Sequence, residues 1–314
     1  MPRMKTSVAL VGLMAVIAAA LLAALVFSGP NLPAGQKTTV ATTMGILAEI
    51  VDRLTEGEVP IYTVVPAGVD LHDWEPTPDV LVKLRDAKML VWLVDGLDDW
   101  AVKLAQSTGV RAYMVSRGVQ LIELSDEHVH NHKHDSKHSH GHYDPHLWLS
   151  PKAMVAVTEN IAKALKSEFP NLGSKIDANA QRYIQELRLL DDELSALLKP
   201  YRGRVFITQH NAFQYFARDY GLKAVAVFDV EGVEPSAQHV AEIIKLIDEN
   251  KLKVIFAEVG HESPVIQSIA REKGLRVELL PTGHADITLE TSRSGKGYIW
   301  MMRSIATAVV QSFG

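Results

Sequence analysis

The chain has 314 residues, enough for one large domain or for two lobes with an ample hydrophobic core. Its net charge of −5 at pH 7, from 32 basic and 37 acidic residues, provides no overall basic surface for nucleic acid. The absence of cysteine excludes disulfides, thiolate metal sites and lipid attachment through an N-terminal cysteine. Any metal site must therefore use histidine and carboxylate ligands.

Residues 1–35 have the features of an export signal. Arg3 and Lys5 precede an uncharged apolar run over Ser7–Phe27. This run is longer than the ~7–15 apolar residues of a typical signal peptide and close to the ~20 that span a bilayer. The segment predicts a signal peptide, which we favour, or a retained membrane anchor. In both cases the positive charges stay inside, so we expect the rest of the chain in the periplasm or at the outer face of the cytoplasmic membrane.

Short apolar runs alternate with helical patterns between residues 36 and 172. The predicted strands are Thr39–Thr42, Ile61–Val65, Met89–Leu93 and Ala112–Val115, and the predicted helices are Met44–Leu54, Asp79–Ala87 and Pro151–Glu168. Such alternation is typical of a mainly parallel sheet. We therefore predict an N-terminal α/β lobe over 36–172, which contains a polar, histidine-rich loop over 125–143.

Residues 173–200 carry the pattern of one long helix. Its apolar residues recur in steps of three and four, which indicates a single buried stripe; they are Ile176, Ala180, Tyr183, Ile184, Leu187, Leu190, Leu194, Leu197 and Leu198. Pro200 ends the pattern. At ~1.5 Å per residue the helix would extend for ~40 Å. This length suits a rigid link between two lobes.

The alternation of strands and helices resumes over residues 201–314. The predicted strands are Arg204–Thr208, Ala224–Val227, Val254–Ala257 and Arg276–Leu280, and the predicted helices are Ala212–Tyr220, Ser236–Glu249, Pro264–Lys273 and Gly297–Ser312. We predict a second α/β lobe here. The fold class is therefore α/β, with two lobes of mainly parallel sheet joined by one rigid helix and a binding site in the cleft between the lobes.

Isolated polar residues in loops that adjoin the predicted strands and helices are the candidate metal ligands. His72 follows the second strand, His146 precedes the Pro151 helix, His210 follows the first strand of the second lobe, and Asp286 follows the last strand. Open α/β sheets bind ligands at the carboxyl ends of their strands. Each residue could equally be an ordinary loop or capping residue, and His284 is as plausible a ligand as its neighbour Asp286.

Several stretches together resemble the metal-binding (cluster A-I) solute-binding proteins of ABC transporters, in particular the zinc-uptake, ZnuA-like branch. They are AGVDLHDWEPTPDVLVKLRDAKMLVWLVDGLDDW, DPHLWLSP, TQHNAFQYFARDYGL, EGVEPSAQHVAEII, VIFAE and DITLETSRSGKGYIWMMRS, and they cover most of residues 38–314. The resemblance implies a metal held between two lobes by His72, His146, His210 and Asp286. It favours Asp286 over His284, because Asp286 keeps the family's distance to the stretch Tyr298–Met302.

The ligand types favour zinc. Three imidazoles and one carboxylate suit tetrahedral Zn²⁺, whereas the manganese branch of the family has Glu at the position of His210. We therefore expect a high-affinity Zn²⁺-binding component that acts as a monomer and delivers the ion to a membrane permease. The alternatives are a manganese-binding component of a transporter, or an extracytoplasmic zinc store or chaperone. An enzyme is not expected, because His261-Glu262-Ser263-Pro264-Val265 lacks the second histidine of a zinc protease motif.

Eight of the thirteen histidines lie between His128 and His146. The crowded part, His128–His142, has almost no apolar residue and cannot form a core of its own. It is either a plain polar loop or, as we predict, a collector that binds several metal ions weakly. Such a collector would raise the local metal concentration near the tight site.

Overall fold

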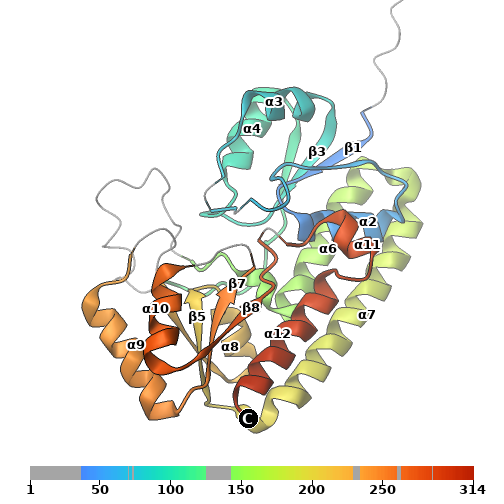
Figure 1. Ribbon diagram of the computed structural model, residues 1–314. Helices are drawn as coiled ribbons and strands as arrows, with labels where there is room; N and C mark the ends of the chain where they lie inside the picture. The colour runs from blue at the N-terminus through green and yellow to red at the C-terminus, as the bar shows by residue number, and fades with distance from the viewer. Residues whose placement is uncertain are drawn as a thin grey trace, which may run out of the picture. The chain divides into compact units, whose positions relative to one another are not determined.

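The described part of the chain is built around two parallel four-stranded sheets, which the computed structural model in Figure 1 displays. The structure describes residues 37–314 except 70, 73, 125–142, 229–233, 260–262 and 285. The predicted leader and nearly all of the predicted histidine-rich loop lie outside the described residues. Thr38–Gly314 form one compact unit. No helix in the described ranges combines the length and the apolar character that a membrane span requires.

The N-terminal sheet has the strand order β2-β1-β3-β4. Its strands are β1 (Thr39–Thr42), β2 (Ile61–Thr63), β3 (Ala87–Trp92) and β4 (Arg111–Met114), and the helices between them are α2 (Gly45–Thr55), α3 (Pro78–Arg85) and α4 (Trp100–Thr108). Strand β3 is almost entirely buried, as expected for an inner strand of a parallel sheet that is covered on both faces. The parallel arrangement brings all four carboxyl ends to one edge of the sheet.

The C-terminal sheet has the strand order β6-β5-β7-β8. Its strands are β5 (Val205–His210), β6 (Lys223–Phe228), β7 (Val254–Glu258) and β8 (Arg276–Leu280), and its helices include α8 (Gln214–Tyr220), α9 (Ala237–Asn250) and α10 (Pro264–Lys273). Helices α9 and α10 pack on each other and against the sheet. This order places β7 between β5 and β8.

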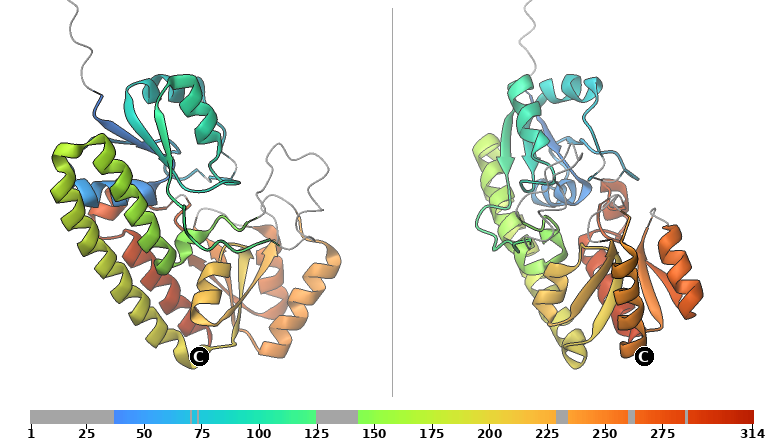
Figure 2. Two further views of the ribbon diagram at one scale, coloured as in Figure 1. Left: turned by 180° about the vertical axis from the view of Figure 1, so that it is seen from behind. Right: turned by 90° about the vertical axis from the view of Figure 1, so that its left-hand side faces the viewer.

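Two long helices lie between the two sheets in the chain, and the second of them, α7, is the linking helix. Helix α6 (Pro151–Glu168) begins at Pro151, and the side chain of Ser150 accepts a hydrogen bond from the Ala153 N–H at its first turn. Helix α7 (Gly173–Leu198) packs along α6 and contacts both α2 and α8. Figure 2 shows α6 and α7 side by side. The predicted stripe of α7 is buried at most positions, whereas Leu197 is 39% exposed.

The C-terminal segment packs on helices of the first half of the chain. After β8 the chain forms α11 (Leu289–Arg293), which packs on α2, and then α12 (Tyr298–Ser312), which packs on α7. The backbone N–H of Tyr298 donates a 2.8 Å hydrogen bond to the buried Glu49 carboxylate of α2. Arg293 also contacts Asp52 of α2 at 2.6 Å. Helix α11 and the first residue of α12 are therefore held against α2.

The predicted fold class is confirmed: two mainly parallel sheets with helices, linked by one long helix. Each of the eight predicted strands is present, although β2 ends at Thr63 and β5 extends to His210. The linking helix ends at Leu198, two residues before the predicted end. Helices α4 and α11 were not predicted from the sequence. Helix α11 has only five residues and depends on a capping box between Thr288 and Thr291.

Candidate metal centre

Four histidines that are distant in sequence meet between the two sheets. His72 follows β2, His146 directly precedes the short 3-10 helix η1 (Leu147–Leu149), His210 is the last residue of β5, and His284 follows β8. One ring nitrogen of each histidine lies within 4.8 Å of those of the other three. The cluster therefore draws on both halves of the chain, as ligands at the carboxyl ends of parallel strands do.

The Nε2 atoms of His72 and His210 both lie close to Nε2 of His146. Nε2 of His146 lies 3.1 Å from Nε2 of His72 and 3.2 Å from Nε2 of His210. The ring of His284 is centred 5.2 Å from the rings of both His146 and His210. His146, His210 and His284 are at most 5% exposed, whereas His72 is half-buried. The cluster is thus an interior site with His72 at its edge.

Asp144 orients His146. Its Oδ1 atom accepts hydrogen bonds from the backbone N–H of His146, at 2.9 Å, and from Nδ1 of the same ring, at 2.7 Å. The Tyr215 hydroxyl donates to the Asp144 carbonyl at 2.7 Å and fixes this turn from α8. The sequence DPHLWLSP therefore forms a rigid turn that presents Nε2 of His146 to the cluster.

Glu258 lies between two histidines of the cluster. It ends β7, and Thr208 of β5 is in register with Phe256 of β7, so His210 and Glu258 end neighbouring strands side by side. Glu258 Oε1 contacts Nδ1 of His210 in a short hydrogen bond, and its Oε2 lies 3.5 Å from Nδ1 of His284. The strand order β5-β7-β8 thus explains why one carboxylate reaches both rings.

The carboxylates determine which ring nitrogen carries the proton. Nδ1 of His146 faces Asp144 and Nδ1 of His210 faces Glu258, so in each neutral ring Nδ1 donates its proton and Nε2 keeps a lone pair. Two such lone pairs 3.2 Å apart repel each other. A cation between them turns this repulsion into attraction. In metal-binding histidines the N–H of the other ring nitrogen typically donates a hydrogen bond to a carboxylate in this way.

The two carboxylates differ in their electrostatics. Burial alone would raise the pKa of Glu258, but His210 and His284 lower it well below its usual range. Burial raises the pKa of Asp144 to about 7, although the N–H of His146 opposes this shift. A proton on Asp144 would sit on Oδ2, which has no hydrogen-bond partner among the described residues. Oδ1 therefore accepts hydrogen bonds from His146 whether Asp144 is ionised or protonated.

Trp148 joins the two loops that carry His146 and His284. Its indole N–H donates to the carbonyl of Thr282 at 2.7 Å, and its ring packs edge-on against His284 at 5.0 Å. The adjoining Gly283 has a φ of +83°, and an added Cβ would lie 2.5 Å from a methyl carbon of Ile46. Only glycine allows this close turn, so Gly283 sets the direction of the His284 side chain.

The structure brings together three of the four predicted ligands, namely His72, His146 and His210. It groups them with His284 and not with Asp286. The Asp286 carboxylate instead accepts a 2.7 Å hydrogen bond from the backbone N–H of Gly283, and burial raises its pKa. Asp286 therefore stabilises the turn that carries His284.

The sequence contained signals for residues that we did not single out. Asp144 lies two residues before His146 in DPHLWLSP, and Glu258 is the only charged residue of the apolar strand Val254–Glu258. An acid at the end of a buried strand is a candidate partner for a neighbouring ligand. Its actual neighbours depend on strand order, which the alternation of strands and helices does not specify.

Comparison with known proteins places the chain in a family. Residues 40–312 match the family model of ZnuA, the periplasmic component A of a zinc-uptake complex. The chain belongs to this family. The high-affinity zinc uptake system protein ZnuA of Bacillus subtilis is 33% identical over 283 residues, which are 88% of each chain. A crystal structure of ZnuA is similar with a TM-score of 0.76 at 27% identity and covers 89% of this chain and 100% of that one.

The family also includes a larger relative. The zinc-binding lipoprotein AdcA of Streptococcus pneumoniae is 28% identical over 280 residues, which are 88% of this chain and 56% of AdcA. The chain therefore spans about half the length of this relative. The Zn(II)-bound ZnuA-like domain of AdcA has a TM-score of 0.72 at 27% identity, and the match covers 88% of this chain and 99% of that domain. The similarity thus lies in the ZnuA-like part of AdcA.

Proposed function

We propose that the protein is the solute-binding component of an ABC transporter that captures Zn²⁺ outside the cytoplasmic membrane and delivers it to a permease. The observation that carries this proposal is the convergence of four imidazole nitrogens within 4.8 Å. The relatives named above are zinc-binding and zinc-uptake proteins. An extracytoplasmic location follows from this role and agrees with the apolar N-terminal segment.

The proposed ligands are His72, His146, His210 and His284. Four nitrogen ligands suit Zn²⁺ in a tetrahedral site, whereas Mn²⁺ prefers carboxylate oxygen. Asp144 and Glu258 accept from Nδ1 of these rings and raise the basicity of Nε2. Four protein ligands leave no open position for an activated water, so the role is binding rather than catalysis.

Ion binding would tie the two halves of the molecule together. His72 and His146 precede the linking helix α7 in the chain, whereas His210 and His284 follow it, at or after strands of the C-terminal sheet. A bound cation cancels the repulsion between their lone pairs and therefore favours the arrangement in which the four histidines lie together. The half-buried His72 is the ligand through which the ion enters and leaves. A monomer with bound ion would present this arrangement to the permease.

The metal content of the purified protein tests the proposal. Wild-type protein expressed without added metal should contain about one tightly held zinc per chain, because the four ligands form one site. The variant His210→Ala should lose it. His239→Ala is the matched control, since His239 lies on α9 and contacts the carbonyl of Ala226 outside the cluster. Manganese in the wild-type protein would overturn the choice of metal.

Uptake measurements separate transport from storage. Zinc accumulation by cells should require both this protein and a membrane permease, and it should fall when His210 is replaced by Ala. A protein that only stores zinc would bind the ion in the same way but would leave uptake unchanged when it is deleted.

A further inference from the structure

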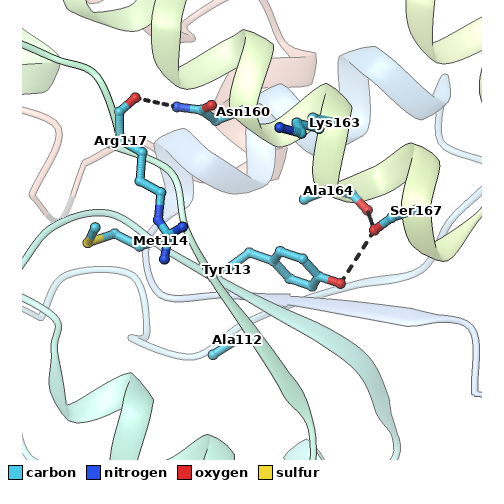
Figure 3. Close-up of a pocket in the computed structure, with 8 residues that line it drawn as sticks. All are labelled: Ala112, Tyr113, Met114, Arg117, Asn160, Lys163, Ala164 and Ser167. Carbon is cyan, nitrogen blue, oxygen red and sulfur yellow. Dashed lines mark hydrogen bonds between the residues drawn. The ribbon is translucent and has the colours of Figure 1, made fainter.

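The structure has a pocket that is separate from the histidine cluster. It has a volume of about 480 Å³ and lies between strand β4 and helix α6 (Figure 3). None of the four clustered histidines lines it. Its volume falls within the range of roughly 300–1,000 Å³ that is typical of sites for small molecules.

The lining of this pocket is positively charged. Arg117, from the segment after β4, and Lys163, from α6, both line it. Among the described residues neither side chain forms an ion pair, and no carboxylate belongs to the lining. The adjacent Glu168 is already occupied, because it accepts from Arg111 at 2.7 Å and from the Tyr113 hydroxyl at 2.6 Å. Two cationic groups therefore face the pocket without a compensating acid.

Hydrogen bonds hold the walls of the pocket in place. The side-chain amide of Asn160 donates to the carbonyls of Val115, at 3.0 Å, and Arg117, at 2.8 Å. Figure 3 shows the Arg117 side chain extending from this anchored backbone toward Met114 and Tyr113. The guanidinium is thus displayed from a fixed backbone, which reduces the conformational entropy lost on binding.

We propose that this pocket binds a small organic oxyanion, that is, a carboxylate or phosphate group on a short apolar body. A guanidinium offers paired donors that match either oxyanion, and an ammonium adds a second charge. Met114 and the methyl groups of Ala112 and Ala164 supply apolar surface beside these charges. The site is independent of the histidine cluster, so its occupation does not require zinc.

Calorimetric titration with two probes tests this proposal. Inorganic phosphate represents the phosphate group, and butyrate represents a carboxylate on a short apolar body. Each probe is compared with sodium chloride at equal ionic strength. We expect the wild-type protein to bind at least one probe beyond the effect of salt. The double variant Arg117→Gln/Lys163→Gln should weaken this binding by about tenfold or more, because charge-assisted hydrogen bonds are lost.

The matched control is Lys103→Gln/Arg188→Gln, which removes the same charges from exposed positions on α4 and α7. It should bind the probes like the wild type. Unchanged zinc content in both double variants would show that the fold is intact. Absence of binding by both probes overturns the proposal, and so does an equal loss in the control variant, which would indicate general charge attraction.

Discussion

The Nε2 atoms of His146 and His210 lie 3.2 Å apart, while the Nδ1 atom of each ring faces a buried carboxylate. Each carboxylate holds the proton of its ring on the outer nitrogen, so the lone pairs meet in the centre. Without a cation this arrangement is repulsive. The geometry of these two residues is therefore arranged for metal binding before any ion enters.

Replacement of Glu258 by Gln should weaken zinc binding without unfolding the protein. The amide still accepts from one ring but carries no charge, so Nε2 of His210 becomes less basic. Loss of such an orienting carboxylate typically lowers metal affinity by about 10–100-fold. Competition with a chelator of known affinity measures the change. Glu278→Gln is the control, since Glu278 pairs with Arg276 on β8; equal affinities for both variants would contradict the role of Glu258.

The fourth ligand is decided by comparing His284→Ala with Asp286→Ala. We expect His284→Ala to lower zinc affinity by more than about a hundredfold, because a ligand contributes more than the groups that orient it. Asp286→Ala should have a smaller effect, since its carboxylate acts through the N–H of Gly283. The d–d absorption spectrum of the Co²⁺ form should change with His284→Ala only. The opposite pattern would restore Asp286 as the ligand.

Zinc affinity should fall as the pH decreases. Each ligand must be a neutral imidazole, whose ordinary pKa is ~6.5, so protons and zinc compete. Glu258 stays ionised throughout, because His210 and His284 lower its pKa despite its burial. Asp144 gains its proton near pH 7, since burial raises its pKa to about 7, and this loss of charge beside His146 also weakens binding.

Below pH ~6 the affinity should therefore decrease by at least about tenfold per pH unit, as expected when more than one imidazole titrates. Chelator competition between pH 7.5 and 5.5 measures the slope. In Asp144→Asn the decrease near pH 7 should be smaller, because the amide does not titrate. An affinity independent of pH in the wild-type protein would exclude an all-histidine site.

Glycine at position 45 should be essential for the contact between α2 and the segment that follows His284. A Cβ at Gly45 would overlap the carbonyl oxygen of Ile287. We expect Gly45→Ala to lower the free energy of unfolding by about 2 kcal/mol and to reduce zinc affinity by displacing His284. Gly173 also begins a helix, but nothing lies within 4 Å of its Cβ position. Gly173→Ala should raise the free energy of unfolding by about 0.5 kcal/mol. Urea unfolding of the metal-free proteins compares the two.

Three residues of the cluster could be predicted because the sequence around each one shows its place beside a predicted strand or helix. His72, His146 and His210 each stand in a loop or at a strand end where a parallel sheet presents ligands. The choice between His284 and Asp286 could not be made from the neighbouring sequence. It depends on the positive φ of Gly283 and on the packing of Trp148 against this turn. Both are tertiary features; the residues alone left His284 and Asp286 equally plausible, and the family resemblance favoured Asp286.

The partners of the ligands were harder to predict for the same reason. Glu258 contacts His210 and His284 only because β7 lies between β5 and β8. Strands that alternate with helices can adopt several orders, and the hydrophobic pattern of each strand is nearly the same in all of them. The individual strands could therefore be predicted from the sequence. The contacts of Glu258 with the ligands could not, because they depend on the order of the strands in the sheet.

Deletion of Glu127–His142 should leave the tight zinc site intact. All four proposed ligands lie outside this segment, and the segment itself falls wholly outside the described residues. Its crowded histidines predict weak, multiple binding, so the deletion should remove only low-affinity zinc equivalents. Calorimetric titration of wild type and deletion measures both classes of site. A Gly/Ser segment of equal length controls for shortening of the loop. Loss of the tight site in that control as well would show that these histidines belong to the metal centre.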